Sequence, residues 1–211
     1  MGRIQKGILG GFQGTVGTVE GSSWKGIQVM KSKKTKTKRP PTDKQLVQRD
    51  KFSLVLKFIS SFGKLTSICF SNPAEQMTGR NLAFQYSIKN AVTGTFPNIA
   101  IDYSKVLLSK GNLQNAVSPT VTSAGGGIVK FGWGDNSGIP MANADDKCVM
   151  ALYCPELHKA VYTWDGATRH TGAATINAGI FLGKTVETWI AFISADGKEP
   201  SASVFTGQLV V

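Results

Sequence analysis

Regularly spaced turn signals divide residues 118–211 into short stretches of β-prone residues. The turn signals are Gly125-Gly126-Gly127, Asp135-Asn136-Ser137-Gly138, Asp165-Gly166 and Asp196-Gly197. Between them we predict seven strands: Thr120–Ser123, Ile128–Trp133, Lys147–Cys154, Ala160–Trp164, Ala173–Ile176, Val186–Ser194 and Ser203–Val210. Short strands at this spacing are typical of a β-sandwich of the immunoglobulin or fibronectin III type. We therefore expect residues 118–211 to form such a sandwich.

Two tryptophans and two cysteines on the predicted strands bear on its core. The buried aromatic of an immunoglobulin-type core would here be Trp133 or Trp189. Cys148 and Cys154 lie on one strand, about 20 Å apart at the usual strand rise, which is too far for a disulfide. Cys69 lies between two apolar residues and is expected to be a small buried hydrophobe. We therefore expect three free thiols.

Two helices are predicted before the sandwich. A double proline excludes helix before Thr42, and Thr42 with Gln45 forms the pattern of a capping box. Apolar residues then recur at helical spacing to about Phe62. A second helix is predicted from Pro73, a position where helices tolerate proline, to Gly94. We expect the apolar side of each helix to pack into a core.

Further β-structure is predicted on both sides of these helices. Residues 7–30 hold seven glycines with short β-prone stretches between them, which indicates an irregular hairpin. They lack the G-x-x-x-x-G-K-[ST] order of a phosphate-binding loop. From residue 98 the period changes to two, so Ile99–Tyr103 and Val106–Leu108 are predicted to pair as strands. The predicted fold class is α+β, with a basic hairpin and two helices in residues 1–117 and the sandwich in residues 118–211.

The net positive charge belongs to the first third of the chain. Residues 1–65 hold fourteen Lys and Arg against three acidic residues, whereas residues 66–211 hold ten of each, so the net charge of +11 arises in the first segment. It is densest at residues 31–39, with six cations in nine positions. Because unpaired buried charge costs several kcal/mol per ion, we expect this run to be exposed.

Three interpretations of this charge stay open. Lys and Arg that neutralise phosphates release counterions, so the run suits a nucleic-acid backbone. It also suits an acidic protein surface, and it is typical of a solvated loop. The candidate anion-binding residues are Lys25, Lys31, Lys33, Lys34, Lys36, Lys38, Arg39, Lys44 and Arg49.

Six sequence motifs carry a resemblance to known proteins. They are Gly7-Ile8-Leu9-Gly10-Gly11-Phe12-x-Gly14-x-Val16-Gly17, Ser23-Trp24-Lys25-Gly26, Pro41-Thr42-x-x-Gln45-x-x-x-Arg49-x-x-Phe52, Lys89–Thr95, Ile101–Val106 and Ile193–Lys198. Over nearly its whole length the chain resembles a family of uncharacterised proteins of similar size, common in Bacteroidota and their mobile elements. The resemblance implies no activity and no catalytic residues.

The Pro41–Phe52 motif has a second, looser resemblance. It is similar to segments of phage and prophage proteins, several of them virion-associated. The lysine-dense residues 31–39 depart from the pattern of the uncharacterised family and favour an anionic partner.

The residues offer little for catalysis or metal binding. His158 and His170 are the only histidines, and no Cys or carboxylate stands at ligand spacing from them. Asp135-Asn136 and Asp145-Asp146 flank one loop and offer oxygens to Ca²⁺, but turn formation explains them equally well. The G-x-S-x-G order of a strained nucleophile turn is absent from the sequence. We therefore predict no enzymatic activity, no cofactor and no metal.

Three functions remain as hypotheses. The first is a non-enzymatic structural protein of a phage-like virion or another large homo-oligomeric assembly, because glycine-rich arms and edge strands suit β-augmentation between subunits. The second is nucleic-acid binding through residues 25–64, although only Phe12 and Trp24 precede Arg49 as aromatic residues for base stacking. The third is a carbohydrate-binding or adhesion module, with exposed Trp133, Tyr162 or Trp164 stacking on sugars.

Composition and targeting signals bound where such a protein acts. Hydrophobic residues make up 41% of the chain and charged residues 18%, which is enough apolar material for a core. The sequence lacks the ~20 consecutive apolar residues of a membrane helix. Residues 1–6 fit neither a signal peptide nor a myristoylation signal. We expect synthesis in the cytoplasm, no membrane partner, and a virion as the final location under the first hypothesis.

Overall fold

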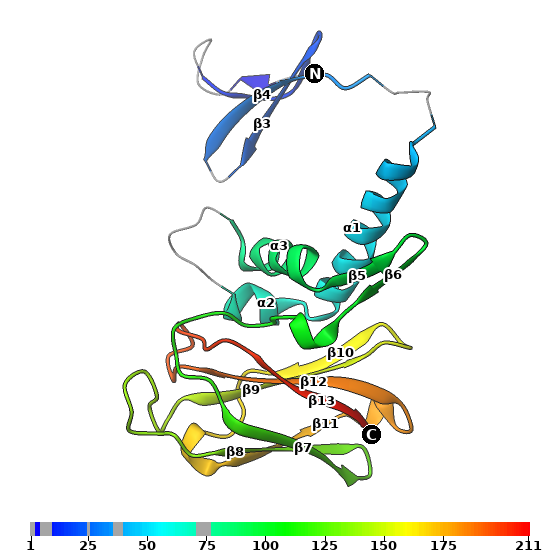
Figure 1. The fold of residues 1–211 in the computed structure, drawn as a ribbon. Helices are drawn as coiled ribbons and strands as arrows, with labels where there is room; N and C mark the ends of the chain where they lie inside the picture. The colour runs from blue at the N-terminus through cyan, green and yellow to red at the C-terminus, as the bar shows by residue number, and fades with distance from the viewer. Residues whose placement is uncertain (1–2, 5–9, 25, 36–39, 71–76) are drawn as a thin grey trace. The chain divides into compact units, whose positions relative to one another are not determined.

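The computed structural model describes residues 3–4, 10–24, 26–35, 40–70 and 77–211 (Figure 1). The chain divides into two compact units, residues 1–42 and residues 43–211, which we call the N-terminal unit and the main unit. Helices and antiparallel sheets both contribute to the structure, so the predicted α+β class is confirmed.

The N-terminal unit is an antiparallel sheet whose strands are neighbours in chain order. They are β1 (Arg3–Ile4), β2 (Phe12–Val16), β3 (Val19–Trp24) and β4 (Ile27–Ser32). Gly17 at φ +57° and Gly26 at φ +84° make the two tight turns, in a backbone conformation that glycine adopts without strain. These turns join β2 to β3 and β3 to β4. The residues of the predicted hairpin thus form part of a four-stranded antiparallel sheet.

The helices differ from prediction mainly after the first one. Helix α1 (Asp43–Ser61) begins directly after Thr42, as predicted, and a short helix α2 (Lys64–Cys69) follows that was not predicted. Helix α3 (Gly79–Asn90) begins directly after Thr78, which is extended and whose side chain accepts a hydrogen bond from the Asn81 N–H. The predicted start at Pro73 lies outside the described residues. The predicted end at Gly94 is wrong, since the helix ends at Asn90.

A small hairpin follows α3. Strand β5 (Val92–Thr95) pairs with β6 (Asn98–Ile101), where Gly94 at φ +82° helps the chain to reverse. The predicted partner strand Val106–Leu108 is therefore wrong: it follows a short 3-10 helix, η1 (Tyr103–Lys105), and is not a strand. Burial in the core accounts for the apolar side chains of Val106 and Leu108 without a strand. The Leu108 N–H donates to the Ser203 hydroxyl at 2.9 Å.

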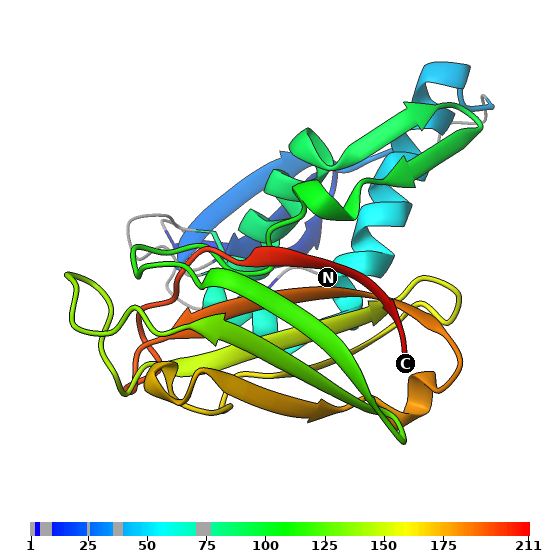
Figure 2. The same ribbon diagram turned by 60° about the horizontal axis from the view of Figure 1, so that its bottom comes forward.

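All seven strands predicted for residues 118–211 are present within a few residues of their predicted bounds. They are β7 (Val117–Gly125), β8 (Ile128–Gly134), β9 (Lys147–Cys154), β10 (Lys159–Thr163), β11 (Ala173–Asn177), β12 (Thr185–Ile193) and β13 (Val204–Val210). The short 3-10 helices η2 (Arg169–Thr171) and η3 (Gly179–Phe181) flank β11. One sheet has the order β10-β9-β12-β13 and the other the order β11-β8-β7 (Figure 2). We call this pair of sheets the two-sheet body.

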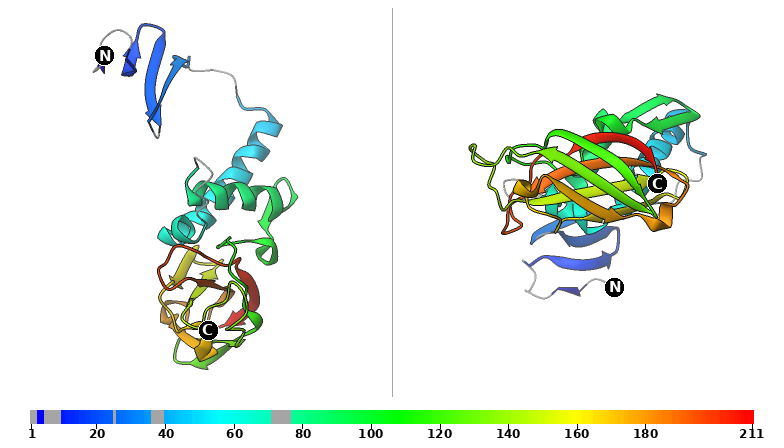
Figure 3. Two further views of the ribbon diagram at one scale, coloured as in Figure 1. Left: turned by 90° about the vertical axis from the view of Figure 1, so that its left-hand side faces the viewer. Right: turned by 90° about the horizontal axis from the view of Figure 1, so that it is seen from below.

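Two buried clusters lie on the two faces of the four-stranded sheet. Alternate residues of β9 and β12 point to opposite faces. Leu152 and Phe192 meet Phe131 and Trp133 of the three-stranded sheet. Tyr153 and Trp189 on the other face meet Phe58 and Phe62 of α1. The left panel of Figure 3 looks nearly along the strands, and the helices lie above the two sheets in that view.

Both candidate core tryptophans are buried, in different clusters. Trp133 lies between the two sheets, and Trp189 lies under the helices. The helices before residue 117 and the strands after residue 118 therefore share one core, with the Phe58 and Tyr153 rings 4.9 Å apart. The two compact units are divided after Thr42.

Candidate functional site

The predicted basic residues fall in both units. Lys31, Lys33 and Lys34 are exposed at the end of β4 and just beyond it, in the N-terminal unit. Lys44 and Arg49 are exposed on α1, in the main unit. The remaining predicted residues, Lys25, Lys36, Lys38 and Arg39, lie outside the described residues.

Only one of the three described lysines near β4 has an acidic partner in the described part of the chain. The Lys31 ammonium lies 3.8 Å from a Glu20 carboxylate oxygen, in an exposed pair that contributes little to stability. Lys33 and Lys34 form no ion pair with any described residue. These two lysines are therefore available to an anionic partner.

Strand register sorts the side chains of the N-terminal sheet onto two faces. Residues directly opposite each other on antiparallel strands share a face, and Val19 is opposite Ser32 while Trp24 is opposite Ile27. The side that we call the Trp24 face carries Trp24, Ile27, Val29 and the Glu20–Lys31 pair. The other side, the Phe12 face, carries Phe12, Val16, Val19 and Met30.

Apolar side chains of the described residues are exposed on both faces of this sheet. All six residues of β4 are exposed, and Trp24 and Met30 keep 58% and 69% of their surface accessible. Among the residues of this unit whose burial is described, only Gly21 is buried. Covering an apolar face of a small sheet stabilises it in water. The pattern Ile27-Gln28-Val29-Met30 predicted the strand, but sequence alone did not indicate that its apolar side chains would stay exposed.

A second apolar surface is a groove between α1 and α3 in the main unit. Its volume is about 350 Å³, and it is lined by Phe52, Leu56, Ile59, Met77, Arg80, Asn81, Phe84, Gln85 and Ile88. The Phe52 and Phe84 rings meet at its wall with centroids 4.6 Å apart. Helical spacing placed Phe52 and Ile59 in the core, but only Ile59 is buried, because the first half of α1 extends past the residues that cover the second half.

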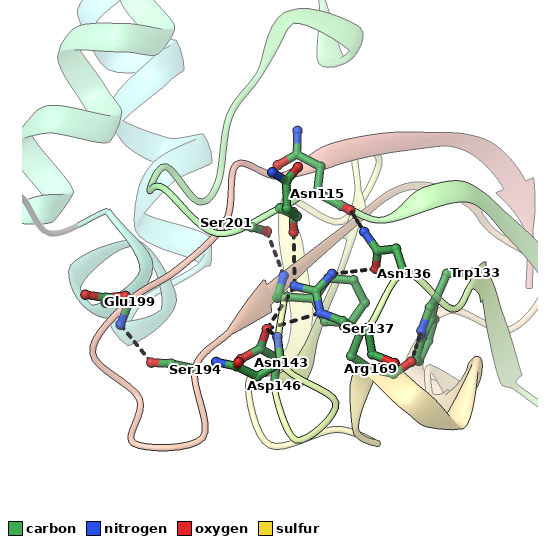
Figure 4. A network of polar contacts seen from close by, with 12 residues as sticks. Asn115, Trp133, Asn136, Ser137, Asn143, Asp146, Arg169, Ser194, Glu199 and Ser201 are labelled. Carbon is green, nitrogen blue, oxygen red and sulfur yellow. Dashed lines mark hydrogen bonds and ion pairs between the residues drawn. The ribbon is translucent and has the colours of Figure 1, made fainter. Parts of the chain in front are cut away.

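The loop that offered oxygens to calcium is held by a buried ion pair (Figure 4). The Arg169 guanidinium donates to Asp146 Oδ2 at 3.0 and 3.1 Å, and both side chains are fully buried. Arg169 also donates to the Asn136 side chain at 2.8 Å and to the Gln114 carbonyl at 3.0 Å. The Trp133 indole N–H donates to the Arg169 carbonyl at 2.7 Å. Through their contacts with Arg169, Asp146 and Asn136 therefore hold the β8–β9 loop against the two sheets.

The two histidines do not form a pair. His170 lies near the Lys147 end of β9, where Lys147 bridges Thr168, whereas His158 lies in the turn beyond the Cys154 end. His170 Nδ1 is 3.1 Å from an Asp135 carboxylate oxygen. Hydrogen bonds from Ser137 and then from His170 hold the pKa of Asp135 below its usual value. The described residues contain no group of three or more His, Cys, Asp or Glu side chains placed to hold a metal ion.

The cysteines are buried and reduced. Cys69, Cys148 and Cys154 are free thiols with no accessible surface. Burial raises the pKa of Cys69 and of Cys148 to about 12. A thiol with so high a pKa is a poor nucleophile, because the thiolate is the reactive form.

Two of the three aromatic residues considered for sugar stacking reach the surface. Trp133 is buried between the sheets. Tyr162 and Trp164 stack at the end of β10, with ring centroids 5.9 Å apart, and Trp164 keeps 36% of its surface exposed. Carbohydrate binding at this pair stays a prediction. Within the described ranges, none of the helices has the length and apolar character needed to cross a bilayer.

Comparison with known proteins gives one match. A family model described as a family of unknown function (DUF6266) matches residues 11–207, which include parts of both units. No curated protein matches the chain, and no solved structure matches it.

Proposed function

The chain belongs to the DUF6266 family, and from that premise we propose that it is a non-enzymatic structural subunit of a large homo-oligomeric assembly. The main unit acts as the rigid body, and the N-terminal sheet contacts a neighbouring subunit. A phage-like virion is the assembly that the resemblance of the Pro41–Phe52 motif favours.

The exposed N-terminal sheet is the observation that carries this proposal. Trp24, Ile27 and Val29 are exposed on one face, while Val16 and Met30 are exposed on the other. Burying a side chain of this kind contributes roughly 1.5–3 kcal/mol. A sheet of this size without a core of its own gains most of its stability by packing against another surface.

The edge of the sheet supports the same proposal. Strand β4 pairs with β3 on one side only, and its other edge has no strand partner among the described residues. Unpaired edges of this kind accept a strand from another chain. The N-terminal unit also holds nine Lys and Arg against the single acid Glu20, a charge that favours an anionic partner in addition to the apolar subunit contact.

We further propose that the two-sheet body is of the immunoglobulin or fibronectin III type. Its first, second and fifth strands share one sheet and its third, sixth and seventh strands share the other, as in immunoglobulin domains. The fourth strand, β10, lies beside the third, whereas constant-type immunoglobulin domains place it in the first sheet. Bodies of this kind commonly serve as rigid modules of surface proteins.

Light scattering after size exclusion tests the proposal on the full chain. We expect a high-mass species that persists at high salt and after nuclease treatment. The double variant Ile27→Ser, Val29→Ser should lower that mass, because it removes apolar side chains from the Trp24 face. The matched control Ile139→Ser, Met141→Ser changes two similarly exposed residues in the main unit and should keep the wild-type mass. A wild-type chain that is monomeric under all these conditions would refute the proposal.

Nucleic-acid binding through residues 31–39 is the second candidate. It is favoured by the exposure of Lys33 and Lys34 and by their lack of an acidic partner among the described residues. It predicts absorbance at 260 nm that co-purifies with the chain and an affinity that falls steeply with salt. Changing Lys33, Lys34, Lys36 and Lys38 to Ser should abolish both effects while leaving the oligomer mass intact. Full DNA affinity in that variant would exclude this run as the contact.

A further inference from the structure

The groove between α1 and α3, which we call the α1–α3 groove, joins apolar side chains of two helices into one continuous surface. It has a volume of about 350 Å³, and the Phe52 ring of α1 meets the Phe84 ring of α3 at its wall. Phe52, Leu56 and Met77 keep 48%, 40% and 42% of their surface accessible. Ile59 is fully buried, so the groove has an apolar floor as well as exposed apolar walls. An exposed apolar surface of this kind commonly marks an interaction site.

The charged side chains along this groove are cationic. Arg80 belongs to its lining, and Arg49 lines a neighbouring hollow that shares Phe52 with it. Both arginines are exposed, and neither forms an ion pair with a described residue. Among the described residues, none that lines the groove or the hollow is acidic. Charge complementarity therefore favours an occupant with negative charge.

The two arginines lie toward opposite ends of the groove along α1. Arg80 donates a hydrogen bond to the Ser60 hydroxyl, near the end of that helix. Arg49 lies on the same helix eleven residues before Ser60, which is about 16 Å at the helical rise. The apolar residues Phe52 and Leu56 lie between these two positions. A matching ligand has an apolar middle with negative charge on both sides of it.

Shape and charge favour a helix of another protein over the other occupants. A groove between two helices accepts the side-chain ridge of a third helix. A flat lipid surface does not reach a buried floor residue such as Ile59. A small apolar acid is enclosed over most of its surface in its site, whereas Phe52 and Leu56 keep at least 40% of theirs accessible. A second copy brings like charge, because Lys and Arg exceed acids by nine to one in the N-terminal unit and by fifteen to twelve in the main unit.

We infer that the α1–α3 groove binds an acidic amphipathic helix of a partner protein. Apolar side chains of that helix, at positions i, i+3 or i+4 and i+7, span about 10 Å, which matches the distance from Phe52 to Ile59 along α1. Asp or Glu on the flanking turns of the partner helix pair with Arg49 and Arg80. This partner is not a copy of the chain, so the inference goes beyond the proposed function and does not depend on it.

Fluorescence anisotropy of the full chain with two labelled peptides tests this inference. Each peptide has about 18 residues, which is long enough to form some helix on its own, and carries leucines along one face. One peptide has Glu on the turns that flank the leucines, and the other has Lys at the same positions. We expect the Glu peptide to bind at least about tenfold more tightly than the Lys peptide. Equal affinities, or no binding of the Glu peptide, would overturn the inference.

Charge-reversal variants locate the binding site. Arg49→Glu, Arg80→Glu should weaken binding of the Glu peptide by at least about tenfold and strengthen binding of the Lys peptide. The matched control Lys57→Glu, Lys89→Glu makes the same change in net charge at exposed residues of the same two helices, outside the groove lining, and should lose little affinity. If the control loses as much affinity as the arginine variant, net charge alone attracts the peptide and the inference is wrong.

Apolar variants and two further outcomes complete the test. Leu56→Ser, Met77→Ser should also weaken the Glu peptide by at least about tenfold, whereas Ile139→Ser, Met141→Ser, with similar exposure, should bind as wild type. Dissociation of a homo-oligomer by the Glu peptide would place a second copy in the groove and overturn the inference. Leu56-dependent binding to vesicles of phosphatidylcholine and phosphatidylglycerol, without peptide binding, would overturn it in favour of a lipid surface. A monomeric wild type that binds the Glu peptide would refute the proposed function and support this inference.

Discussion

The central carbon of the Arg169 guanidinium lies over the ring of Phe192, 3.9 Å from the ring centroid, inside the two-sheet body. The same side chain is paired with Asp146 and is fully buried. One residue thus connects the packed core of the sheets to the β8–β9 loop that contains Asn136 and Asp146.

Removing Arg169 should destabilise the main unit strongly. Arg169→Ala leaves Asp146 buried without its counter-charge, which typically costs about 3–5 kcal/mol. Urea denaturation measures this loss. The control is Lys147→Ala, which breaks the exposed Lys147–Asp165 pair and should cost less than about 1 kcal/mol. Equal losses in the two variants would show that the buried pair has no special role.

Phe58 tests whether the helices and the two-sheet body unfold together. Its ring contacts Phe62, Tyr153 and Trp189, so Phe58→Ala should cost about 3–5 kcal/mol. Far-ultraviolet circular dichroism and tryptophan fluorescence should report one coincident transition in both wild type and variant. Leu56→Ala, on the exposed side of the same helix, should change stability by less than about 1 kcal/mol. Two separated transitions would instead support a domain boundary at residues 117 and 118.

The strands of the two-sheet body were predictable because each is set by local signals. Turn residues such as Asp165-Gly166 mark their ends, and alternation or β-prone runs mark their interiors. The partner of β6 was not predictable in the same way, because the apolar run Val106–Leu108 is equally consistent with a strand and with a buried irregular segment. In the structure β6 pairs with β5, which precedes it directly in the chain and is joined to it by a tight turn near Gly94.

The candidate surfaces depend on long-range packing, which one sequence does not reveal. Phe52 and Phe84 lie far apart in the chain, and only the packing of α1 against α3 brings them to one groove. The exposure of Val29 likewise depends on which described residues pack on its face of the sheet, and a single sequence does not show this. The charge of residues 31–39, by contrast, can be read directly from neighbouring residues, so sequence alone predicts that they are exposed. Lys31, Lys33 and Lys34, which the structure describes, are exposed.

The three cysteines should be unreactive in the folded chain. Cys69 and Cys148 have pKa values of about 12, so about a thousandfold less thiolate is present at neutral pH than for a thiol at its ordinary pKa of 9.0. Ellman's reagent should detect no thiol in the native protein and all three in urea. Rapid labelling of one cysteine without denaturant would contradict the burial of that residue.

Glu187 should make stability depend on pH in the direction opposite to a salt-bridged acid. Burial raises its pKa in the folded chain, although a hydrogen bond from Gln208 opposes the shift. The folded state therefore holds the proton to higher pH than the unfolded state does, and stability falls as pH rises from the ordinary carboxyl pKa through the raised one. Glu187→Gln should stabilise the chain at neutral pH and lose that advantage below the ordinary carboxyl pKa. Thermal unfolding of wild type and variant across this pH range measures the effect, and a gain of equal size at both ends would contradict it.

Gly21 is required for the N-terminal sheet because Phe12 lies directly over it. A Cβ at this position would come within 2.3 Å of the Phe12 carbonyl oxygen and 2.7 Å of its ring. Gly21→Ala should therefore separate β2 from β3, remove amide-exchange protection from both strands and reduce the oligomer mass, while the unfolding of the main unit stays unchanged. Gly17→Ala is the matched control: its φ of +57° costs about 1 kcal/mol for alanine, but nothing lies within 4 Å of the added carbon. Intact protection of β2 and β3 in Gly21→Ala would show that the sheet accommodates a side chain there, and a lost oligomer with an intact sheet would place the assembly contact on Gly21 itself.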